Sequence, residues 1–526
     1  MARLIDKLKT AAIATGIGVM ASVVAIPFAA KYSATTLMEV LRVAYMTPLT
    51  DWPIPLSLTY LYVIIFDLAV AAFILVLFRN KKWTFRPLAL DSAEAATNLL
   101  NEGTPEKKPR IFAGTFGGKA FHVSIEDRGL VIGPPGTGKT SFLVNQILRA
   151  SQKGLSFAVI DIKPELYSIL AAPLQKAGYR VLRVNPARDD PDADHWNPLE
   201  DLTDETDIAE LCVALLPIHD PKQAPYVNAQ LDWLKAAIFH VKSQPGGSLP
   251  SAFNLLSSQS DAQKLLDMLS ESPSSITARI ARRIQSGLSG KKPDALILSG
   301  LSECLRTLDY IGLPGVQSAL GHSDFSAREL GKDSRPVALF LQFEETRINA
   351  LGPLLAFMAT SLLTTLIDTA QQRKPVALFL DELGNMPPIP GLIEKLNTIR
   401  SRNIPTWMYF QSAEQIERRY GPGAANIFFG SANIRIVFRL NDQTTRELIS
   451  KLVGTTEREQ FSQSTGTNTK GRSASTTKGR ERVNIIEPHE LGQLLPGEVV
   501  CLYWGTAAKG QATPYYVDFP KFKRKT

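Results

Sequence analysis

The chain has 526 residues, of which 44% are hydrophobic and 21% are charged. This composition excludes a chain that is disordered throughout and a polytopic transporter, and the length predicts several domains. Lys+Arg exceed Asp+Glu by 58 − 50 = 8, which fits a nucleic acid or anionic lipid partner and also a charge that only maintains solubility. The three cysteines lie far apart and the six histidines show no metal-ligand spacing, so we predict neither a disulfide framework nor a zinc site.

Two apolar segments near the amino terminus are long enough to cross a bilayer, which takes about 20 helical residues. Residues 11–30 carry no charge, and residues 56–78 carry only Asp67. Basic residues concentrate on the outer flanks of this pair: Arg3, Lys7, Lys9, Arg79, Lys81, Lys82 and Arg86. By the positive-inside rule we predict two transmembrane helices with both termini in the cytoplasm. A cleaved signal peptide is the alternative, although it would have a shorter apolar region and no second span.

A nucleotide-binding motif follows a polar linker at residues 92–110 and a short β-rich stretch. An apolar segment at residues 129–132 leads into Gly133-Pro-Pro-Gly-Thr-Gly-Lys-Thr, which matches the P-loop pattern G-x-x-x-x-G-K-[ST]. The glycines let backbone N–H groups and the helix dipole face phosphates, the lysine reaches the β and γ phosphates, and the threonine hydroxyl binds Mg²⁺. The predicted ATP-binding residues are Gly133, Gly136, Thr137, Gly138, Lys139, Thr140 and Ser141.

A second apolar run, residues 375–380, ends in Asp381 and Glu382. A parallel sheet places the carboxyl-terminal residues of such a strand at the edge where ligands bind. We predict a Walker B motif, in which Asp381 holds Mg²⁺ together with Thr140, and Glu382 is the general base that polarises the attacking water. The two motifs need each other chemically, so their joint presence predicts an enzyme that hydrolyses ATP.

A third group of candidate site residues follows the Walker B motif. Residues 392–400 have helical spacing, and residues 406–410 form a predicted strand that ends in Gln411. A glutamine at this strand end lies beside the γ-phosphate in recombinase-like ATPases, which makes Gln411 a candidate sensor of that phosphate. Arg400 and Arg402 are candidates for an arginine finger, and we prefer Arg400. The alternative is a solvated helix end, where positive charge suits the helix dipole.

Together these motifs predict an α/β fold, namely a P-loop NTPase of the RecA-like kind with a mostly parallel central sheet. Apolar residues at three- and four-residue steps in 207–216, 230–241 and 274–288 predict an inserted all-α domain. We divide the chain into a membrane anchor (1–90), a first part of the nucleotide-binding domain (91–198), the inserted all-α domain (199–331) and a second part of the nucleotide-binding domain (332–526).

Three basic segments have no assigned role. Arg279, Arg282 and Arg283 make a basic helical face, residues 465–482 make a basic stretch rich in Ser, Thr and Gly that we predict to be a mobile loop, and the tail 521–526 is also basic. The helical face and the stretch 465–482 could contact the phosphates of a nucleic acid, whereas the tail could contact a protein partner. The alternative in every case is a solvated surface.

Several further segments resemble the type IV secretion coupling protein family, the conjugative DNA-transfer ATPases of the same broad group as the FtsK and HerA translocases. These segments are, in chain order, Asp161-Ile-Lys-Pro-Glu-Leu, Trp196-Asn-Pro-Leu, Ser323-Asp-Phe, Leu378 to Glu382, Ser450-Lys-Leu-Val-Gly and Leu495-Pro-Gly-Glu-Val-Val. Arg400 and Gln411 also keep the eleven-residue step between the finger and the glutamine of that family. The P-loop departs from the serine-rich loops common in the family.

The resemblance implies a homohexameric ATPase of the bacterial inner membrane that uses ATP and Mg²⁺, in which Arg400 acts on the ATP of a neighbouring subunit. It also implies partners: single-stranded DNA with an attached relaxase, effector proteins or both as cargo, and the inner-membrane components of a type IV secretion channel. ATP hydrolysis would deliver the cargo to that channel. The sequence carries no motif that separates a DNA cargo from a protein cargo.

Two other functions fit parts of the sequence. The first is a double-stranded DNA translocase of the FtsK and HerA kind, which usually has more membrane spans, a long linker and a small winged-helix end. The second is a non-catalytic membrane receptor that uses the fold only to display its α domain to substrates. The complete pair of nucleotide motifs argues against this receptor.

Overall fold

The computed structural model describes residues 90–218, 220–258, 261–289, 295–332, 334–468 and 471–522. All of them belong to the second of two compact units, Pro87–Thr526. The two predicted membrane spans, residues 11–30 and 56–78, lie outside the described residues.

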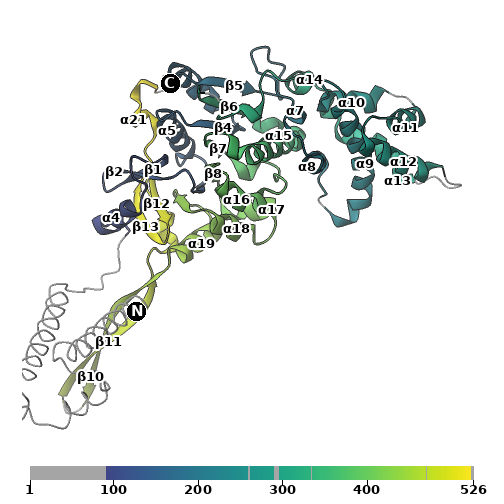
Figure 1. Ribbon diagram of the computed structural model, residues 1–526. Coiled ribbons are helices and arrows are strands. Elements are labelled where there is room, and N and C mark those ends of the chain that lie inside the picture. The colour runs from purple at the N-terminus through teal and green to yellow at the C-terminus, as the bar shows by residue number, and fades with distance from the viewer. Residues whose placement is uncertain are drawn as a thin grey trace, which may run out of the picture. The chain divides into compact units, whose positions relative to one another are not determined.

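Eleven strands form one sheet, in the order β2-β1-β13-β12-β9-β3-β8-β7-β4-β6-β5 (Figure 1). The seven strands from β9 to β5 pair in parallel, whereas the four from β2 to β12 pair antiparallel. The predicted mostly parallel sheet is therefore confirmed. The strands of this sheet are β1 Arg110–Phe116, β2 Lys119–Ser124, β3 Gly129–Ile132, β4 Ser156–Asp161, β5 Arg180–Val184, β6 Val337–Gln342, β7 Val376–Leu380, β8 Thr406–Phe410, β9 Ile434–Val437, β12 Glu498–Tyr503 and β13 Thr506–Gln511.

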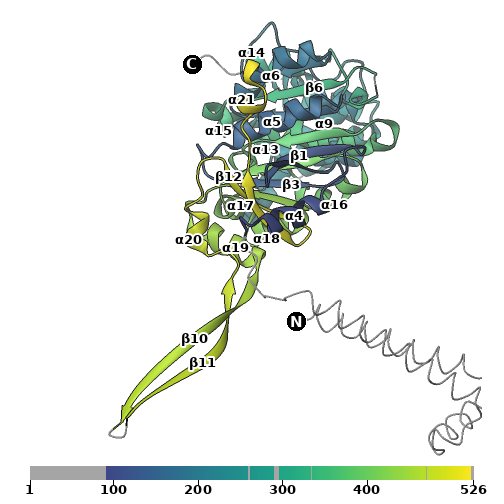
Figure 2. The ribbon, with the colours of Figure 1, turned by 90° about the vertical axis from the view of Figure 1, so that its left-hand side faces the viewer.

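Helices cover both faces of the sheet (Figure 2). Alternate residues of one strand belong to different apolar cores: Ala158 and Ile160 of β4 join one core, while Phe157 and Val159 join the other. Such strands read as continuous apolar runs because neither face meets water. The helices are α4 Ala93–Glu102, α5 Lys139–Ser151, α6 Glu165–Lys176, α7 Pro198–Asp201, α8 Glu205–Leu215, α9 Ala224–Lys242, α10 Leu249–Ser258, α11 Ala262–Ser270, α12 Ser275–Leu288, α13 Ala295–Thr307, α14 Pro314–Gly321, α15 Ile348–Asp368, α16 Leu392–Ser401, α17 Ala413–Tyr420, α18 Ala424–Ser431, α19 Gln443–Val453, α20 Pro488–Leu491 and α21 Tyr515–Asp518.

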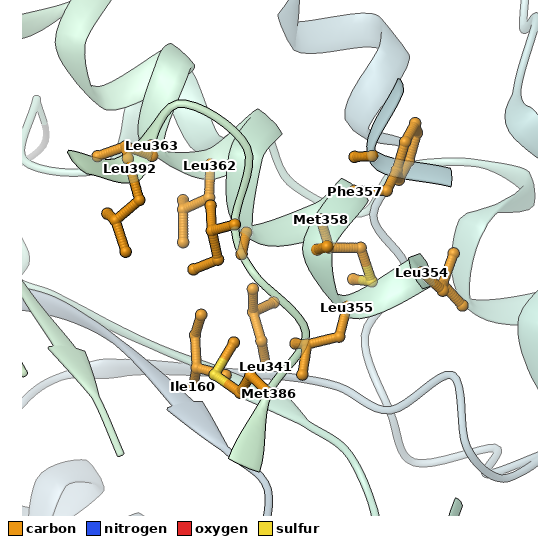
Figure 3. Packing of buried hydrophobic residues seen from close by; sticks show 14 of the residues in the cluster. Ile160, Leu341, Leu354, Leu355, Phe357, Met358, Leu362, Leu363, Met386 and Leu392 are labelled. Atoms are coloured by element: carbon orange, nitrogen blue, oxygen red, sulfur yellow. The ribbon is translucent and has the colours of Figure 1, made fainter. Parts of the chain in front are cut away.

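Helix α15 is the central helix of one core. Leu355 and Met358 of α15 lie beside Ile160 and Leu341 of the sheet in Figure 3. Residues Glu345–Asp368 are long and apolar enough to cross a membrane, but 83% of their most apolar window is buried inside the protein. Burial against the sheet explains this hydropathy without a membrane.

Every described element between β5 and β6 is helical, from α7 to α14. Helices α8, α9 and α12 cover the three segments in which apolar spacing predicted helices. Figure 1 shows α9 to α13 grouped to the right of the sheet, beyond α15 and α8.

Two chain connections meet where this helical segment joins the sheet. His195 lies between β5 and α7, and His322 and Asp324 lie between α14 and β6. The two imidazole rings stack with their centroids 4.2 Å apart, and His195 Nδ1 lies 2.6 Å from Asp324 Oδ2. The hydroxyl of Ser318 lies 3.3 Å from His195 Nε2. The histidines thus form a spatial group that no local spacing reveals, and their contacts tie the two connections together.

Two sequence predictions are wrong at the level of elements. The polar linker predicted at 92–110 contains helix α4. Ser92 caps this helix by accepting a hydrogen bond from Ala95 N–H at 3.1 Å, and the apolar side of the helix bears Ala95 and Leu99, which are buried. The predicted loop at 465–482 belongs to a hairpin, in which β10 (Thr455–Asn468) pairs antiparallel with β11 (Gly471–Asn484) along both strands. Threonine favours extended backbone, and the pairing satisfies the backbone groups of a polar segment.

Candidate nucleotide-binding site

The P-loop connects the end of β3 to the start of α5. Gly136 and Gly138 have φ values of 78° and 105°, a region that residues with a side chain rarely adopt. A Cβ atom at Gly133 would lie 2.7 Å from Cβ of Phe438, so the loop also needs glycine for close packing. Thr137 is buried and donates its hydroxyl hydrogen to Pro134 O at 2.8 Å, which closes the turn.

Lys139 is the first residue of α5 and is only 5% exposed. Its ammonium donates to the carbonyl oxygens of Gly133 at 2.5 Å and Pro134 at 3.2 Å. Burial lowers the pKa of Lys139, while the negative charges of Glu382 and Asp381 oppose that shift. Thr140 and Ser141 follow in the first turn of α5, where backbone N–H groups have no partner inside the helix.

Asp381 and Glu382 directly follow β7, at the same edge of the parallel sheet as the P-loop. Asp381 is 3% exposed, and its Oδ1 atom has no hydrogen-bond partner among the described residues. Burial, followed by repulsion from Glu382, raises the pKa of Asp381 to about 7, and Lys139 opposes this rise. An orphaned buried carboxylate oxygen fits a Mg²⁺ ion, whose charge would favour the ionised form.

Glu382 has an unusual backbone conformation, with φ at 52°. Its carboxylate accepts from Gln411 Nε2 at 2.7 Å and from Asn385 Nδ2 at 3.2 Å, both on Oε2. Lys163 Nζ donates to the other oxygen, Oε1, at 3.2 Å. The strand β8 that ends before Gln411 lies between β3 and β7, so the sheet itself brings the predicted sensor next to the predicted base.

The polar network continues from this site into α17. Gln415 Nε2 donates to Asn385 Oδ1 at 2.6 Å, and the backbone N–H of Gln411 donates to Gln415 Oε1 at 3.1 Å. Gln415 is only 6% exposed. Sequence reasoning named neither Asn385 nor Gln415, because the hydrogen bond that joins them spans 30 positions and no local pattern shows it.

Arg400 does not lie near the P-loop of its own chain. It occupies the last turn of α16, and Arg402 follows at the end of that helix. Arg128, the residue before β3, donates from its guanidinium to Leu396 O and to Asn397 Oδ1, both in α16. The middle of α16 therefore lies at the start of β3, the opposite end of that strand from the P-loop.

The comparisons with known proteins agree with this geometry. A family model described as "Type IV secretory system Conjugative DNA transfer" matches residues 92–526. The conjugal transfer protein TraG of Agrobacterium fabrum is 23% identical over 410 residues, which cover 74% of this chain and 59% of TraG. The chain thus spans about three-fifths of the length of that relative.

Solved structures of the plasmid coupling protein TrwB share the fold. TrwB in complex with the ATP analogue ADPNP matches with a TM-score of 0.62 and 17% identity, over 80% of this chain and 92% of TrwB. TrwB in complex with ADP and Mg²⁺ gives a TM-score of 0.62 and 18% identity, over 80% of this chain and 91% of TrwB. The match of the family model to most of the chain decides the assignment: this protein belongs to the type IV secretory system conjugative DNA transfer family.

Proposed function

We propose that this protein is an inner-membrane ATPase that recruits cargo and delivers it to a type IV secretion channel with the energy of ATP hydrolysis. The observation that carries this proposal is the convergence of Lys139, Asp381, Glu382 and Gln411 at one edge of the parallel sheet. Family membership supports transfer as the process that hydrolysis drives. The TrwB complexes with ADPNP and with ADP and Mg²⁺ support the choice of cofactors.

Each site residue has a proposed role. The backbone N–H groups around Gly136, Thr137 and Gly138 bind the phosphates, with Gly133 keeping the loop close to Phe438 and Ser141 extending the cradle along α5. Lys139 turns from the loop carbonyls to the β and γ phosphates. Thr140 and Asp381 hold Mg²⁺, which supplies positive charge against the negative charge that develops during phosphoryl transfer.

Hydrolysis then needs a base and an oriented water molecule. Glu382 accepts a proton from the water molecule while the oxygen of that water bonds to the γ-phosphorus. The bond between the γ-phosphorus and the bridging oxygen breaks, which yields ADP and phosphate. Gln411 binds both Glu382 and the γ-phosphate region, so it reports whether that phosphate is present.

Arg400 acts in a neighbouring subunit, and the working particle is a homohexamer. Arg400 belongs to α16, which lies at the other end of β3 from the P-loop of the same chain, and this placement supports the arrangement. In such a ring, helix α16 of one subunit faces the P-loop of the next subunit. Each ATP site is then completed by residues of two chains. Hydrolysis in one site then moves one subunit against its neighbour.

The proposed cargo is single-stranded DNA with an attached relaxase, effector proteins or both, and the proposed partners are the inner-membrane components of the channel. Residues 1–90 would anchor the protein by two spans, with the ATPase in the cytoplasm. We further propose that residues 199–331 form an α domain inserted into a nucleotide-binding domain made of 91–198 and 332–526. The helical stretch between β5 and β6 supports this division.

The test compares the wild-type protein with Lys139→Ala. We expect the substitution to reduce ATP hydrolysis at least about 100-fold, because it removes the positive charge that stabilises the transferring phosphoryl group. In the bacterium that encodes this chain, it should also abolish transfer of the cargo while membrane insertion is unchanged. Normal transfer by Lys139→Ala would contradict the motor and leave the receptor function, whereas strict stimulation by double-stranded DNA would favour the FtsK-like translocase.

A further inference from the structure

The Glu382 carboxylate is held at both of its oxygens. Oε2 accepts from the amides of Gln411 and Asn385, and Oε1 accepts from the ammonium of Lys163 at 3.2 Å. Glu382 is only 6% exposed, so water screens these contacts weakly. The contact with Lys163 is the one ion pair of this carboxylate among the described residues, and the charge of Lys139 acts on it from farther away.

The fold explains why Lys163 reaches Glu382 across 219 positions of sequence. Strand β4 pairs in parallel with β7, with Ile160 opposite Leu380. Lys163 and Glu382 follow these two residues at the same sheet edge. Lys163 also lies 3.9 Å from Glu345, whose side chain is 52% exposed, so that second ion pair is screened by solvent.

A general base must point at its water molecule. A hydrogen bond from a lysine ammonium is charge-assisted, so it restricts the direction of the carboxylate oxygen that accepts it. Each carboxylate oxygen offers two lone pairs. Among the described residues Oε1 accepts only from Lys163, so its second lone pair can accept the proton of a water molecule.

We propose that Lys163 is a positioning residue for hydrolysis: its ammonium orients one oxygen of the Glu382 carboxylate, while Gln411 and Asn385 fix the opposite oxygen. This inference rests on the proposed ATPase function and adds to it a residue outside the P-loop that contacts the proposed base. Lys163 acts on the proton transfer, and Lys139 acts on the phosphates. Removal of Lys163 should therefore slow the chemical step and leave nucleotide binding intact.

The test measures steady-state hydrolysis and the affinity for a non-hydrolysable ATP analogue in the full-length protein. Lys163→Met should lower kcat about 10- to 100-fold, which is less than the roughly 10²- to 10⁴-fold of general base catalysis because Glu382 itself remains. KM and analogue affinity should stay within about threefold of wild type. Lys163→Arg should recover part of the loss because it restores the positive charge. The double variant Lys163→Met with Glu382→Gln should be no slower than Glu382→Gln alone, since both changes remove the same function.

The matched control is Glu345→Gln, which removes the exposed partner of Lys163 and should leave kcat unchanged. A wild-type kcat in Lys163→Met would overturn the inference and leave the ATPase proposal standing. Equal losses of kcat and analogue affinity, with no recovery by Lys163→Arg, would show a merely structural lysine and overturn it as well. Absence of hydrolysis in the wild-type protein would contradict the proposed function itself and the role of Lys163 with it.

Discussion

His122 lies on β2, where its ring packs edge-on against Phe112 with the ring centroids 5.7 Å apart. Burial, with the positive charges of Arg110 and Arg149, lowers the pKa of His122 to about 4 from an ordinary 6.5. Between pH 6.5 and pH 4 the unfolded chain therefore binds a proton that the folded chain does not. The stability of the fold falls as the pH drops through this window.

The substitution His122→Phe should weaken this dependence, because phenylalanine keeps an aromatic ring beside Phe112 and binds no proton. We expect the melting temperature to fall less between pH 6.5 and pH 4 in the variant than in the wild-type protein, as measured by circular dichroism. The effect is moderated by the partial exposure of His122, which lets solvent reach the charge. An identical loss in the two proteins would show that other groups control acid unfolding.

At the scale of single residues, the sequence predicts those whose chemistry requires a fixed local pattern. Lys139, Asp381, Glu382 and Gln411 were named from strand ends and glycine spacing, and they lie together. Lys163 belongs to a segment that the family resemblance includes, but no sequence pattern predicts its role. Its partner Glu382 becomes a neighbour only when β4 and β7 pair, and sequence spacing does not encode which strands are adjacent.

Helix α15 shows how hydropathy depends on context at the scale of elements. The helix contains buried residues along nearly its whole length because both the sheet and helix α8 cover it. Leu355 is 0% exposed and packs in the core beside the sheet. Leu355→Ala should destabilise the protein by about 2–5 kcal/mol, the range for truncation of a buried leucine.

Urea unfolding followed by tryptophan fluorescence measures this loss. The control is Asn349→Ala, an exposed residue of the same helix, which should change the stability by less than about 0.5 kcal/mol. If Leu355→Ala were as stable as the control, α15 would not be the core helix that the structure describes.

Elements with strong apolar periodicity were predicted well, and polar ones were not. The strands β3, β7 and β8 are largely apolar runs, and the structure has them where the runs predict. Helix α4 and the hairpin of β10 and β11 were missed, because their sequences are mostly polar. The helix depends on a cap and a short buried side, and the hairpin depends on pairing between two strands, so neither appears as an apolar run.

At the scale of the whole molecule, the two ends of the parallel strands bear different candidate site residues. The carboxyl-terminal ends bear the P-loop and the Walker B residues, and the amino-terminal end of β3 lies beside helix α16, which carries Arg400. Arg128 joins these parts, since it precedes β3 and donates to α16. The sequence names both the loop and the candidate finger Arg400, and the fold places the helix that carries Arg400 at the other end of β3 from the loop.

The central claim is that Lys139, Thr140, Asp381 and Glu382 form an ATP site. The most direct measurement is an experimental structure of the full-length protein with Mg²⁺ and a non-hydrolysable ATP analogue. We expect the triphosphate along residues 133–141, Mg²⁺ between Thr140 and Asp381, Glu382 facing the γ-phosphate, and Arg400 of a neighbouring subunit beside it. An analogue bound elsewhere, or Asp381 and Glu382 turned away from the phosphates, would contradict the account.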